Sequence, residues 1–198
     1  MDRFSLEGKV ALITGAGRGI GAAIARGFSE AGASVVVVSR TEEQVEAVAK
    51  EIREAGGQAL ALVADVRDLG VLPDLVDRTV EEFGGIDTLV NNAGGEVSPP
   101  FMDTTVDHIR DAIHFNVLVP FELSRLAVPH LLQRPGASII NNSSVTTLVS
   151  VRGSLAHHVG KTAESQLTLS MAADLGPKIR VNALLPGAIE TELSLIHI

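Results

Sequence analysis

Short apolar runs alternate along the chain with segments whose apolar residues recur at helical spacing. The runs predict strands buried on both faces, at residues 10–13, 35–38, 59–63, 86–90, 138–140 and 179–184. The intervening spacing predicts helices, including a long one from about 103 to 133 that breaks near Pro120, and another at roughly 153–175. We therefore expect an α/β fold, a doubly wound parallel sheet with helices on both faces, in three layers.

The second helix carries a start signal of its own. Thr41-Glu-Glu-Gln44 has the form of a capping box, and Val45, Val48 and Ile52 follow on one helical face. No internal repeat or linker interrupts the pattern. We expect one domain over residues 1–192, followed by an atypical tail at 193–198.

A glycine-rich turn follows the first predicted strand directly. Gly15, Gly17, Gly19 and Gly21 lie between residues 10–13 and a segment with helical apolar spacing. Such a turn directs unpaired backbone N–H groups and the positive end of a helix dipole toward one point, where a pyrophosphate can bind. A lone glycine pattern can also be a plain structural turn, but the flanking strand and helix favour a dinucleotide site.

Composition excludes several other classes of function. The chain has 198 residues, of which 45% are apolar, and its 16 basic and 24 acidic residues give a net charge of −8. That charge argues against nucleic acid or an anionic membrane as a partner. Cysteine is absent, which removes disulfides and the usual zinc sites, and His108, His114 and His130 show no metal-ligand spacing, so we expect no metal. With neither a signal core nor a membrane-length apolar run, the expected location is cytoplasmic.

The coenzyme preference depends on the residues directly after the second strand. An NAD site usually has an acid about 20 residues after the glycine turn. Here Ser39 and Arg40 occupy that place, and Arg18 lies inside the turn. A guanidinium pairs with a 2′-phosphate that a carboxylate would repel, so NADP(H) is favoured and NAD(H) remains possible. The alternative is that both arginines are solvated loop residues. Asp65 either accepts from the adenine amino group or caps the following helix.

Several spaced motifs coincide with those of a known family. They are Thr14-Gly-x-x-x-Gly19-x-Gly21, Asn91-Asn-Ala-Gly94, Asn116, Ser144, Lys161, and Pro186-Gly187 with Thr191. In this order and spacing the chain resembles the short-chain dehydrogenase/reductase family over residues 6–192. The resemblance implies a Rossmann-type sheet and hydride exchange between a nicotinamide and a small-molecule carbonyl or alcohol.

The resemblance also implies a role for each matched position. Asn116 would support a water, Ser144 would donate to the substrate oxygen, and Lys161 would hold the nicotinamide ribose. Together with the residues singled out above, the coenzyme site is expected to comprise Thr14, Gly15, Gly17, Arg18, Gly19, Ile20, Gly21, Ser39, Arg40, Asp65, Val66, Asn92, Ala93, Gly94, Lys161, Pro186, Gly187, Ile189 and Thr191.

The chain departs from the family at the centre of the chemistry. Family members carry a tyrosine four residues before the lysine, but this chain contains no tyrosine and has His157 there. Positive surroundings disfavour a charged imidazole, so a neutral His157 would be a poor proton source and a usable base in alcohol oxidation. Three interpretations remain: a working acid–base substitute, a coenzyme-binding sensor or scaffold with little turnover, or a change without functional design.

The family pattern normally continues beyond the end of this sequence. The resemblance implies that the last strand and a substrate lid are missing, and residues 193–198 are interpreted as a truncation artefact. The lid selects the substrate, so the sequence names none. A full-length form is expected to be a homodimer or homotetramer through the helices at about 103–133 and 153–175.

Overall fold

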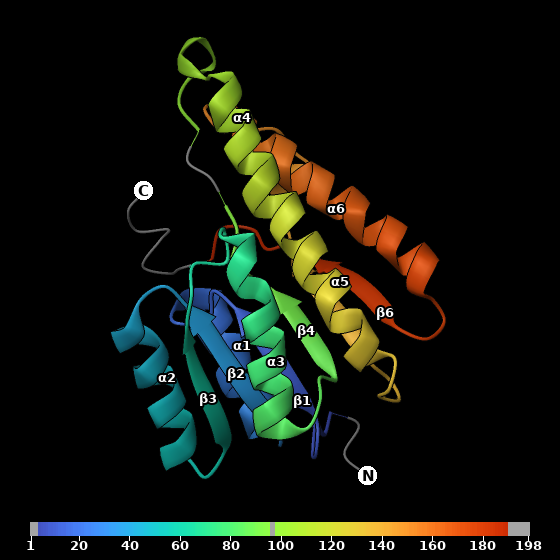
Figure 1. Ribbon diagram of the computed structural model, residues 1–198. Helices are drawn as coiled ribbons and strands as arrows, with labels where there is room; N and C mark the ends of the chain where they lie inside the picture. The colour runs from blue at the N-terminus through green and yellow to red at the C-terminus, as the bar shows by residue number, and fades with distance from the viewer. Residues whose placement is uncertain (1–3, 96–97, 190–198) are drawn as a thin grey trace.

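The computed structural model describes residues 4–95 and 98–189, and its centre is a six-stranded parallel sheet (Figure 1). The strands are β1 (Val10–Thr14), β2 (Ser34–Ser39), β3 (Gln58–Val63), β4 (Thr88–Asn91), β5 (Ser138–Asn142) and β6 (Arg180–Leu184). Their order across the sheet is β3-β2-β1-β4-β5-β6, and every paired neighbour is parallel. The direction of winding therefore reverses between β1 and β4, which confirms the predicted doubly wound sheet.

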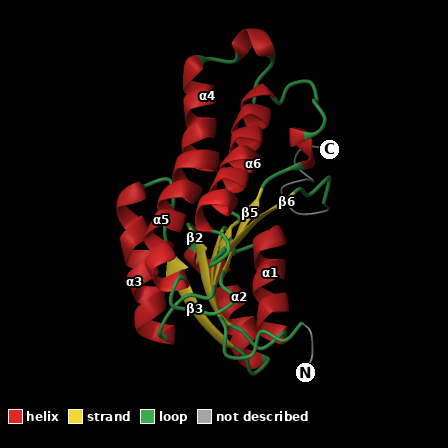
Figure 2. Ribbon diagram, turned by 90° about the vertical axis from the view of Figure 1, so that its right-hand side faces the viewer, coloured by secondary structure: helices red, strands yellow, loops and turns green. Residues whose placement is uncertain are grey.

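Helices cover both faces of this sheet, as the turned view shows (Figure 2). They are α1 (Gly19–Glu30), α2 (Glu42–Glu54), α3 (Leu72–Phe83), α4 (Val106–Ile113), α5 (Val119–Leu131) and α6 (Leu155–Leu175). Buried side chains of α1 and α2 pack on one face, and those of α3, α5 and α6 pack on the other. Short 3-10 turns at Leu69–Val71, Phe101–Asp103 and Val145–Thr147 complete the connections.

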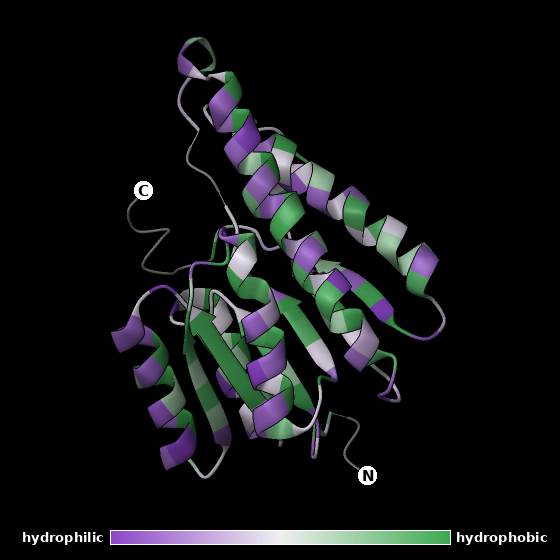
Figure 3. Cartoon of the chain, viewed as in Figure 1, coloured by the Kyte–Doolittle hydropathy of each residue, from purple (hydrophilic) through white to green (hydrophobic). Residues whose placement is uncertain are grey.

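The core is divided by the pleat of the strands. On β1, Leu12 faces the α3, α5 and α6 side, whereas Ala11 and Ile13 face α1 and α2. In Figure 3, β2 is largely hydrophobic, whereas α2 carries many polar residues. The apolar runs of β1 and β2 thus correspond to strands buried on both faces, whereas β3 and β6, at the two edges of the sheet, are partly exposed. None of the helices in the described part of the chain is long and apolar enough to cross a membrane.

One local expectation is wrong. Thr41 is the N-cap of α2, but its side chain makes no capping hydrogen bond, so the expected box with Gln44 does not form. Thr105 makes a reciprocal capping box instead, at the start of α4, with His108 in the partner position. The expected tail at 193–198 lies outside the described residues.

The long helical stretch breaks earlier than Pro120. A π-helical turn at His114–Leu118 separates α4 from α5. Within it, the Asn116 side chain donates to the Ala112 carbonyl oxygen at 2.8 Å, the oxygen that an α-helix would pair with a backbone N–H. Pro120 lies in the first turn of α5, where a missing N–H costs little.

Candidate active site

A cavity of about 670 Å³ lies where the strands end, and most of the predicted site residues line it. Those residues are Gly15, Gly17, Arg18, Gly19, Ile20, Gly21, Ser39, Arg40, Asp65, Val66, Asn92, Ala93, Gly94, Ser144, His157, Lys161, Pro186, Gly187 and Ile189. Thr14 and Asn116 do not line the cavity, and Thr191 lies outside the described residues.

The glycine turn leaves no room for side chains at the start of α1. Gly15 has a φ of +63°, and a Cβ on Gly21 would lie 2.3 Å from the Gly15 carbonyl oxygen. The N-cap of α1 is Arg18, without a side-chain capping bond, and no acidic residue occupies the first turn. Open N–H groups and an unopposed helix dipole therefore face the cavity, which fits a pyrophosphate.

The variant Gly21→Ala tests this close approach. The added methyl would also meet Asn92 Nδ2 at 2.5 Å, so the turn must shift and we expect at least a tenfold loss of coenzyme affinity, about 1.4 kcal/mol. Isothermal titration with NADPH measures it. Gly27→Ala is the matched control on the same helix, because its Cβ would meet nothing within 4 Å. Equal losses in both variants would contradict a specific role for the turn.

Thr14 supports the cavity from behind rather than lining it. Its Oγ1 accepts hydrogen bonds from the backbone N–H groups of Asn92 at 3.1 Å and Ala93 at 3.0 Å. The Asn92 amide in turn donates to the carbonyl oxygens of Thr14 and Gly15 at 2.9 and 3.0 Å. These bonds join the end of β1 to the end of β4 at the point where the strand order reverses.

Further asparagines extend this connection into the core. Asn91 Nδ2 donates to Asn141 Oδ1 at 2.8 Å, and Asn141 Nδ2 donates to Thr168 Oγ1 at 2.8 Å. Asn142 Nδ2 donates to Asn92 Oδ1 at 2.8 Å. The amides therefore tie β4, β5 and α6 together beneath the cavity, a role that no sequence motif indicates for Asn141 or Asn142.

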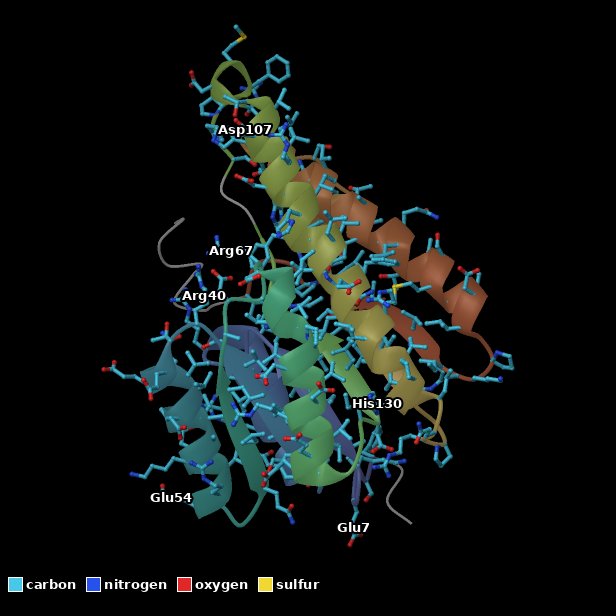
Figure 4. All side chains as sticks on the ribbon, viewed as in Figure 1. Glu7, Arg40, Glu54, Arg67, Asp107 and His130 are labelled. Atoms are coloured by element: carbon cyan, nitrogen blue, oxygen red, sulfur yellow. The ribbon has the colours of Figure 1, made fainter. Side chains whose placement is uncertain are left out.

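Asp65 lies between two guanidinium groups at the end of the cavity nearest α2. Its carboxylate pairs with Arg67 Nη2 at 2.7 Å and more loosely with Arg40 Nη1 at 3.8 Å. Figure 4 shows Arg40 and Arg67 close together. The hydrogen bond from Arg67 is the main cause that lowers the pKa of Asp65. Because Arg67 takes most of this carboxylate, Arg40 keeps a weakly engaged guanidinium at the cavity.

The helix-capping alternative for Asp65 is wrong. Asp68 is the N-cap of the turn at Leu69–Val71 and accepts from the Gly70 N–H at 2.9 Å. Asp65 accepts instead from the backbone N–H of Arg67 at 3.1 Å. Arg67 itself was missed, although a cation two residues after an acid is a usable signal for a local ion pair.

Lys161 is held at the opposite end of the cavity, on the first half of α6. Its Nζ donates to the Asn142 carbonyl oxygen at 2.8 Å and pairs with Glu164 Oε2 at 2.9 Å. Ser144 also lines this end, and its Oγ accepts from the Thr146 N–H at 3.2 Å. A hydroxyl and an ammonium thus lie at one end of the cavity, together with His157.

Asn116 is fully buried behind the cavity wall. Its Oδ1 accepts from the Gly95 N–H at 2.8 Å while its Nδ2 is bound to Ala112. The expectation that Asn116 supports a water stays a prediction, and in the structure its amide joins the loop after β4 to the π-helical turn.

His157 is held in its neutral form. Burial is the largest cause that lowers its pKa from 6.5 to about 4, followed by the charges of Lys161 and His158. The direction agrees with the expectation of a neutral imidazole, but burial rather than positive neighbours contributes most. At neutral pH this side chain can accept a proton and is seldom able to supply one.

Several other residues that line the cavity were not predicted. They are Val38, Thr41, Gln44, Ala64, Gly95, Phe115, Asn142, Ser143 and Ala188. Most of them adjoin a predicted residue, so their place follows from the strand ends. Gln44 and Phe115 come from helical segments that the fold brings to the cavity; the expected capping box included Gln44, but no motif marks either residue as part of a coenzyme site.

Comparisons with known proteins agree with this geometry. The family model for short chain dehydrogenases matches residues 9–195. The 7α-hydroxysteroid dehydrogenase of Escherichia coli (strain K12) is 41% identical over 96% of this chain and 75% of its own length. A versicolorin reductase of Emericella nidulans is 41% identical over 98% of this chain and 74% of its own. A solved 7α-hydroxysteroid dehydrogenase in complex with NADH and 7-oxo glycochenodeoxycholic acid superposes with a TM-score of 0.95, at 40% identity, covering 98% of this chain and 76% of that one.

Proposed function

This chain belongs to the short chain dehydrogenase family and is an NAD(P)-dependent oxidoreductase, and from that premise we propose that it exchanges hydride between NADP(H) and a secondary alcohol or its ketone. The observation that carries the proposal is the single cavity joining the glycine turn and Arg40 at one end to Ser144, His157 and Lys161 at the other. A dinucleotide coenzyme would occupy both ends of this cavity, with its adenosine half at the first and its nicotinamide half at the second.

The residues present fit such a coenzyme. The open first turn of α1 suits the pyrophosphate, and Arg18 and Arg40 suit a 2′-phosphate. We propose that Lys161 holds the nicotinamide ribose and that Pro186 and Gly187 contact the carboxamide, a proposal supported by the place of all three residues in the cavity lining. When bound, the coenzyme supplies or accepts the hydride.

The proton chemistry belongs to His157 and Ser144. In alcohol oxidation, the neutral imidazole accepts the hydroxyl proton while Ser144 donates a hydrogen bond to the same oxygen. In ketone reduction, an imidazolium would have to supply that proton, and the low pKa of His157 makes this form scarce at neutral pH. We therefore propose that the neutral imidazole of His157 is the base in alcohol oxidation.

Binding and turnover together test this function. Titration with NADPH and NADH should show binding, with NADPH tighter, and a panel of cyclic secondary alcohols, including 7α-hydroxysteroids, should give coenzyme reduction. A second candidate is a coenzyme-binding protein with little turnover, which the scarcity of the His157 imidazolium supports. Binding with no turnover in either direction would favour that candidate, and no binding would overturn both.

The pH dependence of alcohol oxidation gives a specific prediction. Because a neutral His157 is the base, kcat/KM should stay level from neutral pH to about pH 5 and fall below about pH 4, where the imidazole becomes protonated. Initial rates, with the fold checked by circular dichroism at each pH, measure the profile. A decline centred near 6.5, the ordinary value for histidine, would contradict the assignment.

A further inference from the structure

Glu164 is a fully buried carboxylate that the proposed reaction does not use. It lies one helical turn after Lys161 on α6, and its Oε2 is 2.9 Å from Lys161 Nζ. The side chain of Lys161 is only 5% exposed. Burial raises the pKa of Glu164, and the charge of Lys161 opposes that rise. A buried pair of this kind is costly to form, and each member depends on the other once it is formed.

The position of the Lys161 ammonium is closely defined by its surroundings. Besides Glu164, it donates to the Asn142 carbonyl oxygen at 2.8 Å. A Cβ on Gly94 would lie 2.8 Å from Nζ, so the ammonium rests against the glycine backbone. An ammonium has three N–H donors. Two of them point to protein oxygens, which leaves one for the cavity.

Lys161 has opposite consequences for a tyrosine and for a histidine at position 157. A nearby ammonium favours a phenolate and disfavours an imidazolium. A carboxylate that reduces the electrostatic field of the ammonium would therefore make a tyrosine at position 157 harder to ionise. Beside a histidine, the same carboxylate would make the imidazole easier to protonate. We propose that Glu164 is a positioning residue that acts through Lys161, fixing the buried ammonium and offsetting the positive charge it exerts on the side chain at position 157.

The other titratable residues of α6 are His157 itself, His158 beside it, and Asp174 near the end of the helix, and further charged groups lie on the segments packed against α6. Ser143, at the end of β5, is the other group that lowers the pKa of Glu164. On α4, which packs along α6, His108 bonds to Thr105 and Arg110 pairs with Asp107. On β6, Arg180 donates to the Gly136 carbonyl oxygen. The further titratable residues on these packed segments are Asp111 and His114.

The chain lacks tyrosine and tryptophan, which makes a direct test possible. In the variant His157→Tyr, the added phenol is the only one in the 198-residue chain. Ultraviolet absorbance of its phenolate therefore reports the electrostatic field at position 157 in the free protein. Adding Glu164→Gln should lower the pKa of this phenol by about one unit, because the Lys161 charge is no longer offset. An unchanged or higher pKa would overturn the proposal.

Glu122→Gln is the matched control. Glu122 also pairs with a cation three residues later on its helix, at 2.6 Å from Arg125, but it lies on α5 and outside the cavity. The same substitution there should leave the phenol pKa unchanged. An equal shift in both variants would show a general charge effect and would also overturn the proposal.

A second variant avoids leaving Lys161 buried without its counter-charge. Combining His157→Tyr with Lys161→Met and Glu164→Leu removes the pair without an unpaired charge. The phenol pKa should then change by less than about half a unit, because an offset pair exerts little field. A rise of more than about one unit would mean that Lys161 acts unopposed, against the proposal. The inference rests on the proposed function only in taking position 157 as the acid–base site. Failure of coenzyme binding would overturn the function and leave these titrations readable.

Discussion

Replacing His157 with tyrosine should raise the rate of ketone reduction at pH 7 by on the order of 100-fold. With a pKa of about 4, only about one imidazole in a thousand carries the proton that reduction needs at that pH. A phenol keeps its proton at pH 7 and is longer, so it reaches further into the cavity.

Single-turnover reduction with NADPH and a cyclic ketone measures this effect without a contribution from product release. His130→Tyr is the control, since His130 lies on α5 away from the cavity (Figure 4). A lower reduction rate in His157→Tyr would contradict the prediction and would show that the histidine itself delivers the proton. No change in either direction would indicate that position 157 takes no part in proton transfer.

Replacing Arg40 with aspartate should reverse the coenzyme preference. A charge-assisted hydrogen bond contributes roughly 1.5–3 kcal/mol, so losing it costs NADPH affinity about tenfold to a hundredfold. The new carboxylate would also repel the 2′-phosphate of NADPH and accept a hydrogen bond from the 2′-hydroxyl of NADH. Both effects lower the preference for NADPH over NADH further. The loose 3.8 Å contact with Asp65 makes Arg40 available for this role.

Dissociation constants for NADPH and NADH, measured on both proteins by titration, give the ratio directly. Arg125→Asp serves as the charge-matched control, because Arg125 is similarly exposed but lies on α5 outside the cavity. An unchanged NADPH-to-NADH ratio in Arg40→Asp would contradict selection by Arg40. The same change in the control would point to overall charge instead.

The strands could be predicted because their physical signal is local. Residues 10–13 and 35–38 are apolar at every position, and β1 and β2 contain them with one or two further residues at their ends. The fifth strand was predicted too short, ending at residue 140. Its last residues are Asn141 and Asn142, and polar amides at a strand end look like a loop until their cross-strand partners are known.

The site could be predicted as far as its spaced motifs reach. The glycines and Lys161 belong to motifs with a recognisable spacing. Glu164 belongs to none, because in the sequence it is one of many acidic residues on predicted helices. Only the folded structure shows that it is fully buried. Likewise, the pKa of His157 depends chiefly on burial, which periodicity does not reveal at a single position beside a cavity.

The π-helical turn between α4 and α5 holds one residue more than an uninterrupted α-helix would, as such insertions do. Deleting Asn116 from the five residues of His114–Leu118 would therefore allow one uninterrupted α-helix to form without rotating α4 and α5 against each other. The deletion would remove the buried side-chain amide of Asn116 and with it the hydrogen bond from the N–H of Gly95, which lines the cavity. A change in this short segment would thus alter the support of the cavity lining at Gly95 while α4 and α5 keep their relative orientation.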